Sequence, residues 1–188
     1  MKKTVVIYES RYGSTKRYAQ WISEELSCPL IRRKDFCSKD FSDYETIIYG
    51  GGLYAGSVVG IKLITQNTQL LSGKNLILFT CGIADPENPE NISHIRTSLD
   101  KILPLEIFSQ VKLFHLRGAI DYARLSPIYK AMMAMLRRML LKKDTNNLSE
   151  EDMQILDTYG KSVDYIDKCT IQPLIQYVRS LAAHCSKS

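Results

Sequence analysis

The stretch VVIYESRYGSTKRYAQWISEEL, residues 5–26, decides the fold because a strand passes directly into a helix within it. Its beginning is a continuous apolar run, and its end repeats apolar residues at helical spacing. Between the two, residues 10–15 gather three hydroxyl side chains around Gly13. The loop either binds an anion or simply caps the helix, and the rest of the chain must distinguish these alternatives.

Further apolar runs alternate with helical patterns along the chain. Strands are expected at 4–8, 46–49, 76–80 and 111–116, with a weaker edge strand at 29–33. Helices are expected at 15–26, 61–71, 92–103 and 149–167. Nearly continuous apolarity is typical of strands buried on both faces, so the pattern predicts an α/β fold with a doubly wound parallel sheet.

The composition fits a single globular domain spanning residues 1–188. Hydrophobic residues make up 45% of the chain and charged residues 24%, which is enough apolar material for a core. The formal net charge is +5, and much of the basic excess lies between Lys130 and Lys143. This local patch, without a recognisable motif, argues against nucleic acid as a partner.

The cysteines and the chain ends indicate a cytoplasmic protein. Five cysteines include no C-x-x-C pair, and the three histidines are scattered, so neither a disulfide framework nor a metal site is expected. The apolar run after the N-terminal lysines is too short for a signal peptide, and no run is long enough to span a membrane. Residues 185–188 are expected to form a disordered tail.

The first loop has the chemistry of a phosphate site. The backbone N–H groups and the positive dipole end at a helix N-terminus attract an anion. Ser10, Ser14 and Thr15 add hydroxyl donors, and Gly13 lets the backbone approach closely. Neither G-x-x-x-x-G-K-[ST] nor G-x-G-x-x-G is present, so this is not a standard nucleotide loop. The alternative is that Ser14 is a plain N-cap.

Two more glycine-bearing loops follow later strands, and parallel strands bring all three loops to one edge of the sheet. GGGLYAG, residues 50–56, combines glycines with Tyr54, which either stacks on a flat ligand or is an ordinary loop residue. TCGIADPENPEN, residues 80–91, places Gly82 just after a strand. Cys81 is interpreted as a small strand-end residue and not as a nucleophile, because no histidine is nearby in sequence to activate it.

Four stretches, taken in order, carry a family resemblance: YESRYGSTKRYA, IIYGGGLYAG, RGAIDYARLSPIYKAMMAMLRRML and KKDTNNLSEED. The chain resembles the flavodoxin-like FMN proteins, and within them it is most similar to the bacterial quinone-dependent protoporphyrinogen oxidases, also called dehydrogenases. The resemblance spans residues 3–170. It implies a flavodoxin-like five-stranded sheet of order 2-1-3-4-5, helices on both faces and an extra helix inserted after the last strand.

The resemblance also implies the cofactor and its binding residues. FMN would be held at its phosphate by the first loop and at its ring by the other two loops. The residues implied are Ser10, Gly13, Ser14, Thr15, Gly51, Gly52, Leu53, Tyr54, Ala55, Cys81, Gly82, Ile83 and Ala84. Arg11 and Tyr12 stand at variable positions of the first loop and are included without an assigned role. No catalytic residue is identified.

The segment SPIYKAMMAMLRRMLLKK, residues 126–143, carries the evidence about partners. It lies in a helical insertion expected at 123–148, with an apolar stripe formed by Ile128, Met132, Met135, Leu136 and Met139. One interpretation is a helix that packs on the core. The other is a surface helix that contacts a quinone, a porphyrin or the inner face of the membrane, because methionine adapts to flat apolar ligands and the flanking cations suit anionic groups.

Three functions remain open from the sequence. The leading one is an FMN-dependent oxidoreductase of heme biosynthesis that uses a porphyrinogen and a quinone. The second is a flavodoxin-type electron carrier that docks redox protein partners, although such carriers are usually acidic and this chain has a net charge of +5. The third is a switch domain without flavin, which requires paired carboxylates after the first strand, where only Glu9 is present.

Overall fold

The structure is a computed structural model, and it describes residues 3–54, 57–144, 148 and 150–184. Two predictions lie outside the described residues: Ala55 as a flavin contact and the tail at 185–188. The strands, helices and 3-10 helices (η) are, in chain order, β1 (Thr4–Glu9), α1 (Ser14–Leu26), β2 (Leu30–Arg32), η1 (Arg33–Asp35), η2 (Ser38–Asp43), β3 (Thr46–Tyr54), β4 (Ser57–Val58), α2 (Lys62–Thr65), α3 (Thr68–Leu71), β5 (Asn75–Gly82), α4 (Pro89–Asp100), α5 (Leu105–Gln110), β6 (Lys112–Arg117), β7 (Ala119–Asp121), η3 (Tyr122–Arg124), α6 (Pro127–Leu140), α7 (Glu150–Thr158), β8 (Ser162–Asp164), η5 (Lys168–Ile171) and α8 (Gln172–His184).

Five strands form a parallel sheet in the order β2-β1-β3-β5-β6. Leaving out the short β4, which pairs antiparallel with the end of β3, this is the order 2-1-3-4-5. The predicted fold class is therefore confirmed. The strand order reverses between β1 and β3, and ligands of such sheets bind beyond the carboxyl ends of the strands at that point.

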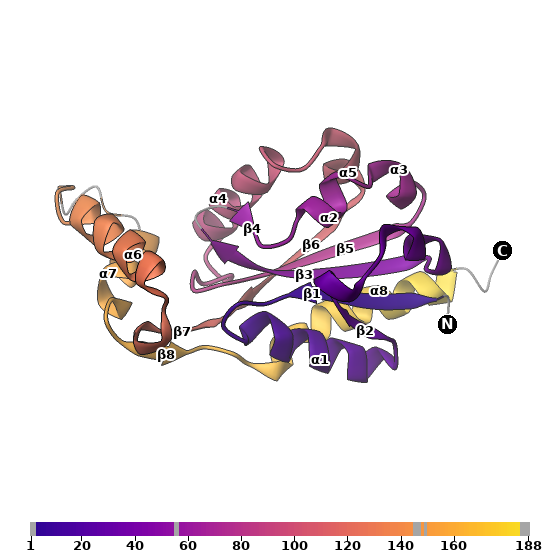
Figure 1. Ribbon diagram of the computed structural model, residues 1–188, viewed down its shortest axis with the longest axis horizontal. Helices are drawn as coiled ribbons and strands as arrows, with labels where there is room; N and C mark the ends of the chain where they lie inside the picture. Colours follow the sequence, from indigo (N-terminus) through magenta and orange to yellow (C-terminus); the bar gives the residue numbers. More distant parts are fainter. Residues whose placement is uncertain (1–2, 55–56, 145–147, 149, 185–188) are drawn as a thin grey trace.

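Helices cover both faces of the sheet (Figure 1). On β1, Val5 and Ile7 face the core under α2 to α5, whereas Val6 faces the core under α1 and α8. All three side chains are fully buried. Burial on both faces is the physical reason for the nearly continuous apolar runs in the sequence.

β3 continues through three glycines beyond the expected end at residue 49. A Cβ atom at Gly50 would collide with the ring of Phe79 on β5, and one at Gly51 would collide with Val58 of β4. Glycine generally weakens strands, so the sequence pattern predicts too early an end. Close packing from neighbouring strands is what requires glycine here.

Two helix predictions were wrong in detail. The helix expected at 61–71 is divided into α2 and α3, which are four residues each. The helix expected at 149–167 ends at Thr158, because Gly160 takes a φ of 77° and the chain then forms β8. The sequence analysis missed α8, which contributes Ile175 to the core.

The chain between β6 and η5 forms an inserted unit beyond the carboxyl ends of the sheet (Figure 1). Its base is a two-stranded antiparallel ribbon, in which Ile120 of β7 pairs with Val163 of β8. α6 and α7 extend from this ribbon. The helical insertion expected at 123–148 falls inside this larger unit.

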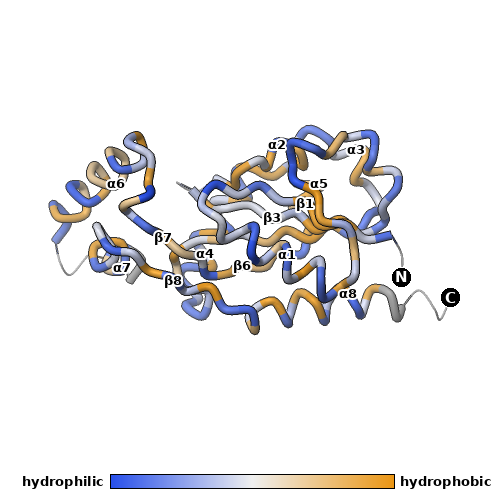
Figure 2. The backbone as a smooth tube through the Cα atoms, turned by 60° about the horizontal axis from the view of Figure 1, so that its bottom comes forward, coloured by the Kyte–Doolittle hydropathy of each residue, from blue (hydrophilic) through white to orange (hydrophobic). Residues whose placement is uncertain are grey.

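α6 turns an apolar stripe outward. The residues on the stripe and their exposed fractions are Ile128 73%, Met132 45%, Met135 67% and Met139 55%. Leu136 is half-buried and Leu140 is buried, so α6 has a second, inner apolar side. Hydrophobic and hydrophilic residues alternate along α6 (Figure 2). Core packing is therefore the wrong interpretation for the stripe. Among the described residues, no helix has the length and apolarity needed to cross a membrane.

Candidate functional site

The first loop ends in a glycine that starts α1. Gly13 is the N-cap with a φ of 102°, and its N–H donates to Ser10 Oγ at 3.1 Å. No side chain caps the first turn of α1, and Ser14 is already helical. The plain N-cap interpretation of Ser14 is therefore wrong. Because the cap residue is glycine, no cap side chain accepts from the first N–H groups of α1. These N–H groups can therefore donate to a bound anion.

The three predicted loops meet at the start of α1. Thr15 is buried, and its hydroxyl is in hydrogen-bonding contact with the Cys81 thiol near the end of β5. A Cβ atom at Gly52 would lie 3.6 Å from Thr15 Oγ1. One at Gly82 would lie 3.7 Å from Leu53. The sheet thus brings together residues of all three predicted loops, and the glycines keep the space between the loops narrow.

The inserted unit also reaches this site, which the sequence analysis did not predict. The Ala119 N–H of β7 donates to Ser14 Oγ at 3.1 Å, and the Gly118 N–H donates to the Gly82 carbonyl at 2.6 Å. Ser14 Oγ accepts in this bond, so its own proton remains available for an anion. Ser14 therefore links the phosphate loop to the inserted unit. The first contact joins residues 105 positions apart, and no local pattern in the sequence indicates either contact.

Three tyrosines and one arginine form a cluster beside the loops, which we call the tyrosine cluster. It joins Tyr12 of the first loop, Tyr54 of β3 and Tyr129 of α6, with ring centroids 5.6–6.2 Å apart. The Arg11 guanidinium carbon lies 5.2 Å from the Tyr54 ring centroid and 5.1 Å from that of Tyr129. These are distances for aromatic and cation–π contacts. Arg11 and Tyr12 therefore connect the loop to α6.

Burial controls the ionisation of Tyr54. The pKa of its phenol is raised to about 12, mainly because the side chain is desolvated; neighbouring Tyr12 contributes to the rise, while Arg11 opposes it. The phenol is therefore neutral at physiological pH. A neutral aromatic side chain at this position can contact a flat ring without carrying a charge toward it.

The third loop is fixed by Arg117 at the end of β6. The Arg117 Nε donates to the Ile83 carbonyl at 3.2 Å, and its Nη1 lies 3.2 Å from Asp85 Oδ2. The guanidinium also lies over the Tyr165 ring at 3.9 Å. Ile83 and Ala84 are half-buried. The loop is thus held against the end of the sheet without help from a ligand.

Cys81 is predicted to be unreactive in the folded protein. Burial raises the pKa of its thiol to about 12, and the thiolate is the reactive form. Under brief iodoacetamide treatment at about pH 8, Cys37 and Cys169, which are exposed, are expected to alkylate at least about tenfold faster than Cys81. Peptide mapping by mass spectrometry measures this. Equal alkylation would contradict the assignment of Cys81 as a buried strand-end residue.

The arrangement fits a phosphate-bearing flat cofactor. The first loop offers an open helix N-terminus and the hydroxyls of Ser10, Ser14 and Thr15. The other loops offer glycine backbone, Leu53 and Tyr54 beside it. Together these features define a doubly wound domain with three loops at the switch point of its sheet, whose chemistry suits a phosphate and a flat ring.

The chain belongs to the Flavodoxin domain family, which matches residues 5–147. Family membership indicates a flavin cofactor and a redox role. Flavodoxin 2 from Bacillus cereus is 15% identical in sequence, with 82% of this chain and 93% of that chain covered and a TM-score of 0.45. A flavodoxin from Streptococcus pneumonia is 14% identical, with 84% and 94% covered and a TM-score of 0.37. The comparison with curated proteins gives no match.

Proposed function

We propose that this protein is an FMN-dependent oxidoreductase similar to the quinone-dependent protoporphyrinogen oxidases. In the proposed reaction, each pair of electrons and pair of protons that leaves a porphyrinogen reduces a quinone to its quinol. The observation that carries the proposal is the contact between the rings of Tyr129 and Tyr54, whose centroids lie 5.6 Å apart. It places α6 of the inserted unit against Tyr54, at the position where the flavin ring would bind. An apolar substrate reaching the ring would therefore meet α6.

Different loops would bind the phosphate and the ring of FMN. Ser10, Ser14 and Thr15 would hold the phosphate together with the first N–H groups of α1. Leu53 and Tyr54 would lie against the ring, with Gly82 on the other loop. When bound, FMN supplies the transfer of one or two electrons. The chain's own contribution is to orient the ring, and to exclude water from it with the tyrosine cluster.

The outer stripe of α6 supports contact with an anionic membrane surface, where quinones are found. Cationic side chains accompany the stripe: Lys130, Arg137, Arg138, Lys142 and Lys143. No acidic residue occurs from 127 to 143. One of these cations, Lys143, is paired with Asp152 of α7 at 2.7 Å. An exposed apolar stripe on a helix that itself carries only basic charges matches anionic lipid headgroups and the acyl boundary below them. This contact would bring the flavin site near its quinone.

Changing Met135 to Asp is expected to weaken binding to vesicles of phosphatidylglycerol and phosphatidylcholine about tenfold. Met135 is 67% exposed, so the change removes buried area at the lipid and adds a repelled charge without disturbing a core. Vesicle cosedimentation measures the partition. The matched control is Leu105→Asp, because Leu105 is 79% exposed and lies on α5 instead. Equal binding of both variants would rule out this surface.

The second candidate is an electron carrier that docks redox proteins through the same stripe. Anaerobic oxidation of protoporphyrinogen, followed by porphyrin fluorescence with and without a menaquinone analogue, separates the candidates. We expect porphyrin to form at a rate that requires both bound FMN and the quinone. Protein that holds FMN but gives no porphyrin above the FMN-only background would favour the carrier.

A further inference from the structure

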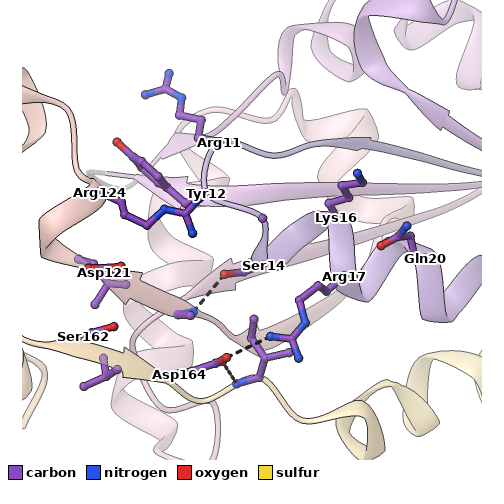
Figure 3. Close-up of a pocket in the computed structure, with 15 residues that line it drawn as sticks. Arg11, Tyr12, Ser14, Lys16, Arg17, Gln20, Asp121, Arg124, Ser162 and Asp164 are labelled. Atoms are coloured by element: carbon purple, nitrogen blue, oxygen red, sulfur yellow. Dashed lines mark hydrogen bonds and ion pairs between the residues drawn. The ribbon is translucent and has the colours of Figure 1, made fainter.

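A second polar pocket lies beside the phosphate loop, between α1 and the β7–β8 ribbon (Figure 3). Its volume is about 840 Å³, within the range of small-molecule sites. Its walls are residues 11–14 of the loop, the outer side of α1 as far as Gln20, and the ribbon with Arg124. The inserted unit therefore creates a cavity that the doubly wound sheet alone would lack.

This pocket is distinct from the place of the flavin ring. Among the described residues, none of 50–54 and none of 81–84 lines it. It shares with the proposed FMN site only residues of the phosphate loop, namely Arg11, Tyr12, Gly13 and Ser14. A ring bound between Tyr54 and Gly82 would therefore leave the pocket free, with the flavin phosphate near its rim.

Charge in the pocket is positive. Four cationic and two acidic side chains line it, giving a formal charge of +2: Arg11, Lys16, Arg17, Arg124, Asp121 and Asp164. Arg17 is already paired with Asp164 at 3.0 Å, and Arg11 lies over the tyrosine rings. Within the described part of the chain, the side chains of Lys16 and Arg124 make neither a hydrogen bond nor an ion pair. These two cations remain available to a ligand.

The geometry favours an anion that also carries hydroxyl groups. Figure 3 shows Arg124 extending from η3 toward the loop that carries Ser14. A guanidinium can grip a phosphate with two parallel hydrogen bonds. On the ribbon side, Asp121 Oδ1 accepts from the Ala123 N–H at 3.0 Å, which leaves Oδ2 as an acceptor. Ser162 lines the same wall. Acceptors opposite a cation suit a phosphorylated sugar better than a simple dicarboxylate.

We propose that this pocket binds the ribose phosphate part of a nucleotide, next to the flavin phosphate. Arg124 and Lys16 would contact the phosphate, and Asp121 would accept from the sugar hydroxyls. The ribose phosphate could belong to a separate molecule or to the nucleotide half of a flavin dinucleotide. Both sources present the same chemistry to the pocket. The proposal does not depend on the identity of the electron donor or acceptor.

Calorimetric titration of the full chain with AMP, in saturating FMN, tests the pocket while the flavin phosphate site is filled. Adenosine serves as the ligand without phosphate. Arg124→Gln removes one exposed cation, and Lys101→Gln is the matched control, because Lys101 is an exposed cation at the end of α4, outside the lining. We expect AMP to bind, adenosine to bind at least about tenfold more weakly, and Arg124→Gln to weaken AMP about tenfold, with no change for the control.

A parallel titration of the apoprotein with FAD and FMN identifies the source. Tighter binding of FAD than of FMN, with the advantage lost in Arg124→Gln, would assign the pocket to the nucleotide half of a flavin dinucleotide. AMP binding to the FMN-saturated protein would assign it to a separate molecule. Equal AMP affinity in wild type and Arg124→Gln, or no AMP binding together with FAD no tighter than FMN, would overturn the proposal. Protein that binds AMP but no flavin would refute the FMN site and leave this pocket supported.

Discussion

Replacing Ser14 and Thr15 together by alanine is expected to weaken FMN binding by at least about a hundredfold. Each hydroxyl would donate to the phosphate, and a hydrogen bond to a charged group contributes about 1.5–3 kcal/mol. Ser14 Oγ keeps a proton to donate even while it accepts from the Ala119 N–H. Quenching of FMN fluorescence in a titration of the apoprotein measures the dissociation constant.

The control for this double variant is Ser180→Ala. Its hydroxyl donates to the Tyr177 carbonyl on the exposed side of α8, far in sequence from the phosphate loop. We expect the control to bind FMN as wild type does. Thermal unfolding of the three apoproteins gives the second measurement. A double variant that melts much earlier but binds FMN normally would show that the two hydroxyls serve stability and not the cofactor.

The second large effect is expected from Gly50→Ala, at the centre of the sheet. A methyl group there would collide with the ring of Phe79 on β5. This ring is fully buried, in the same part of the core as the buried residues of α1 and α8. Overpacking of this kind lowers the free energy of unfolding by about 2 kcal/mol, which corresponds to a melting temperature about 4–8 °C lower for a chain of this size. Calorimetry of the apoprotein measures it.

Gly82→Ala is the matched control for that substitution. A Cβ atom at Gly82, on the neighbouring strand β5, would make ordinary contact with Leu53 at 3.7 Å. We therefore expect its melting temperature to stay within about a degree or two of wild type. If both variants had the same melting temperature, crowding by Phe79 would not explain why β3 requires glycine at position 50.

The strands of the parallel sheet could be predicted because their signals are local, whereas the strand order 2-1-3-4-5 was implied only by the family resemblance. Each buried strand is a short apolar run, and the turn at Gly13 stands between a strand and a periodic helix. The C-terminal region could not be predicted in the same way. β8 exists because it pairs with β7, forty residues away or more, and Ser162–Asp164 alone has no apolar alternation that would indicate a strand.

The candidate site was predictable only where it follows the strand ends. Ser10, Thr15 and Gly82 lie where a parallel sheet brings its loops together. Tyr129 was missed because its contact with Tyr54 depends on where the inserted unit lies beyond the ends of the strands. An aromatic residue near the start of an otherwise Met-rich helix is a weak signal by itself. The pocket at Arg124 was missed for the same reason.

The central claim is that the loop at residues 10–15 holds the phosphate of FMN. Fluorescence titration of the apoprotein with FMN and with riboflavin, which lacks the phosphate, tests it most directly. We predict that FMN fluorescence is quenched at micromolar protein, with riboflavin bound at least about a hundredfold more weakly. FMN that stays fully fluorescent at these concentrations, or riboflavin that binds as tightly as FMN, would contradict the claim.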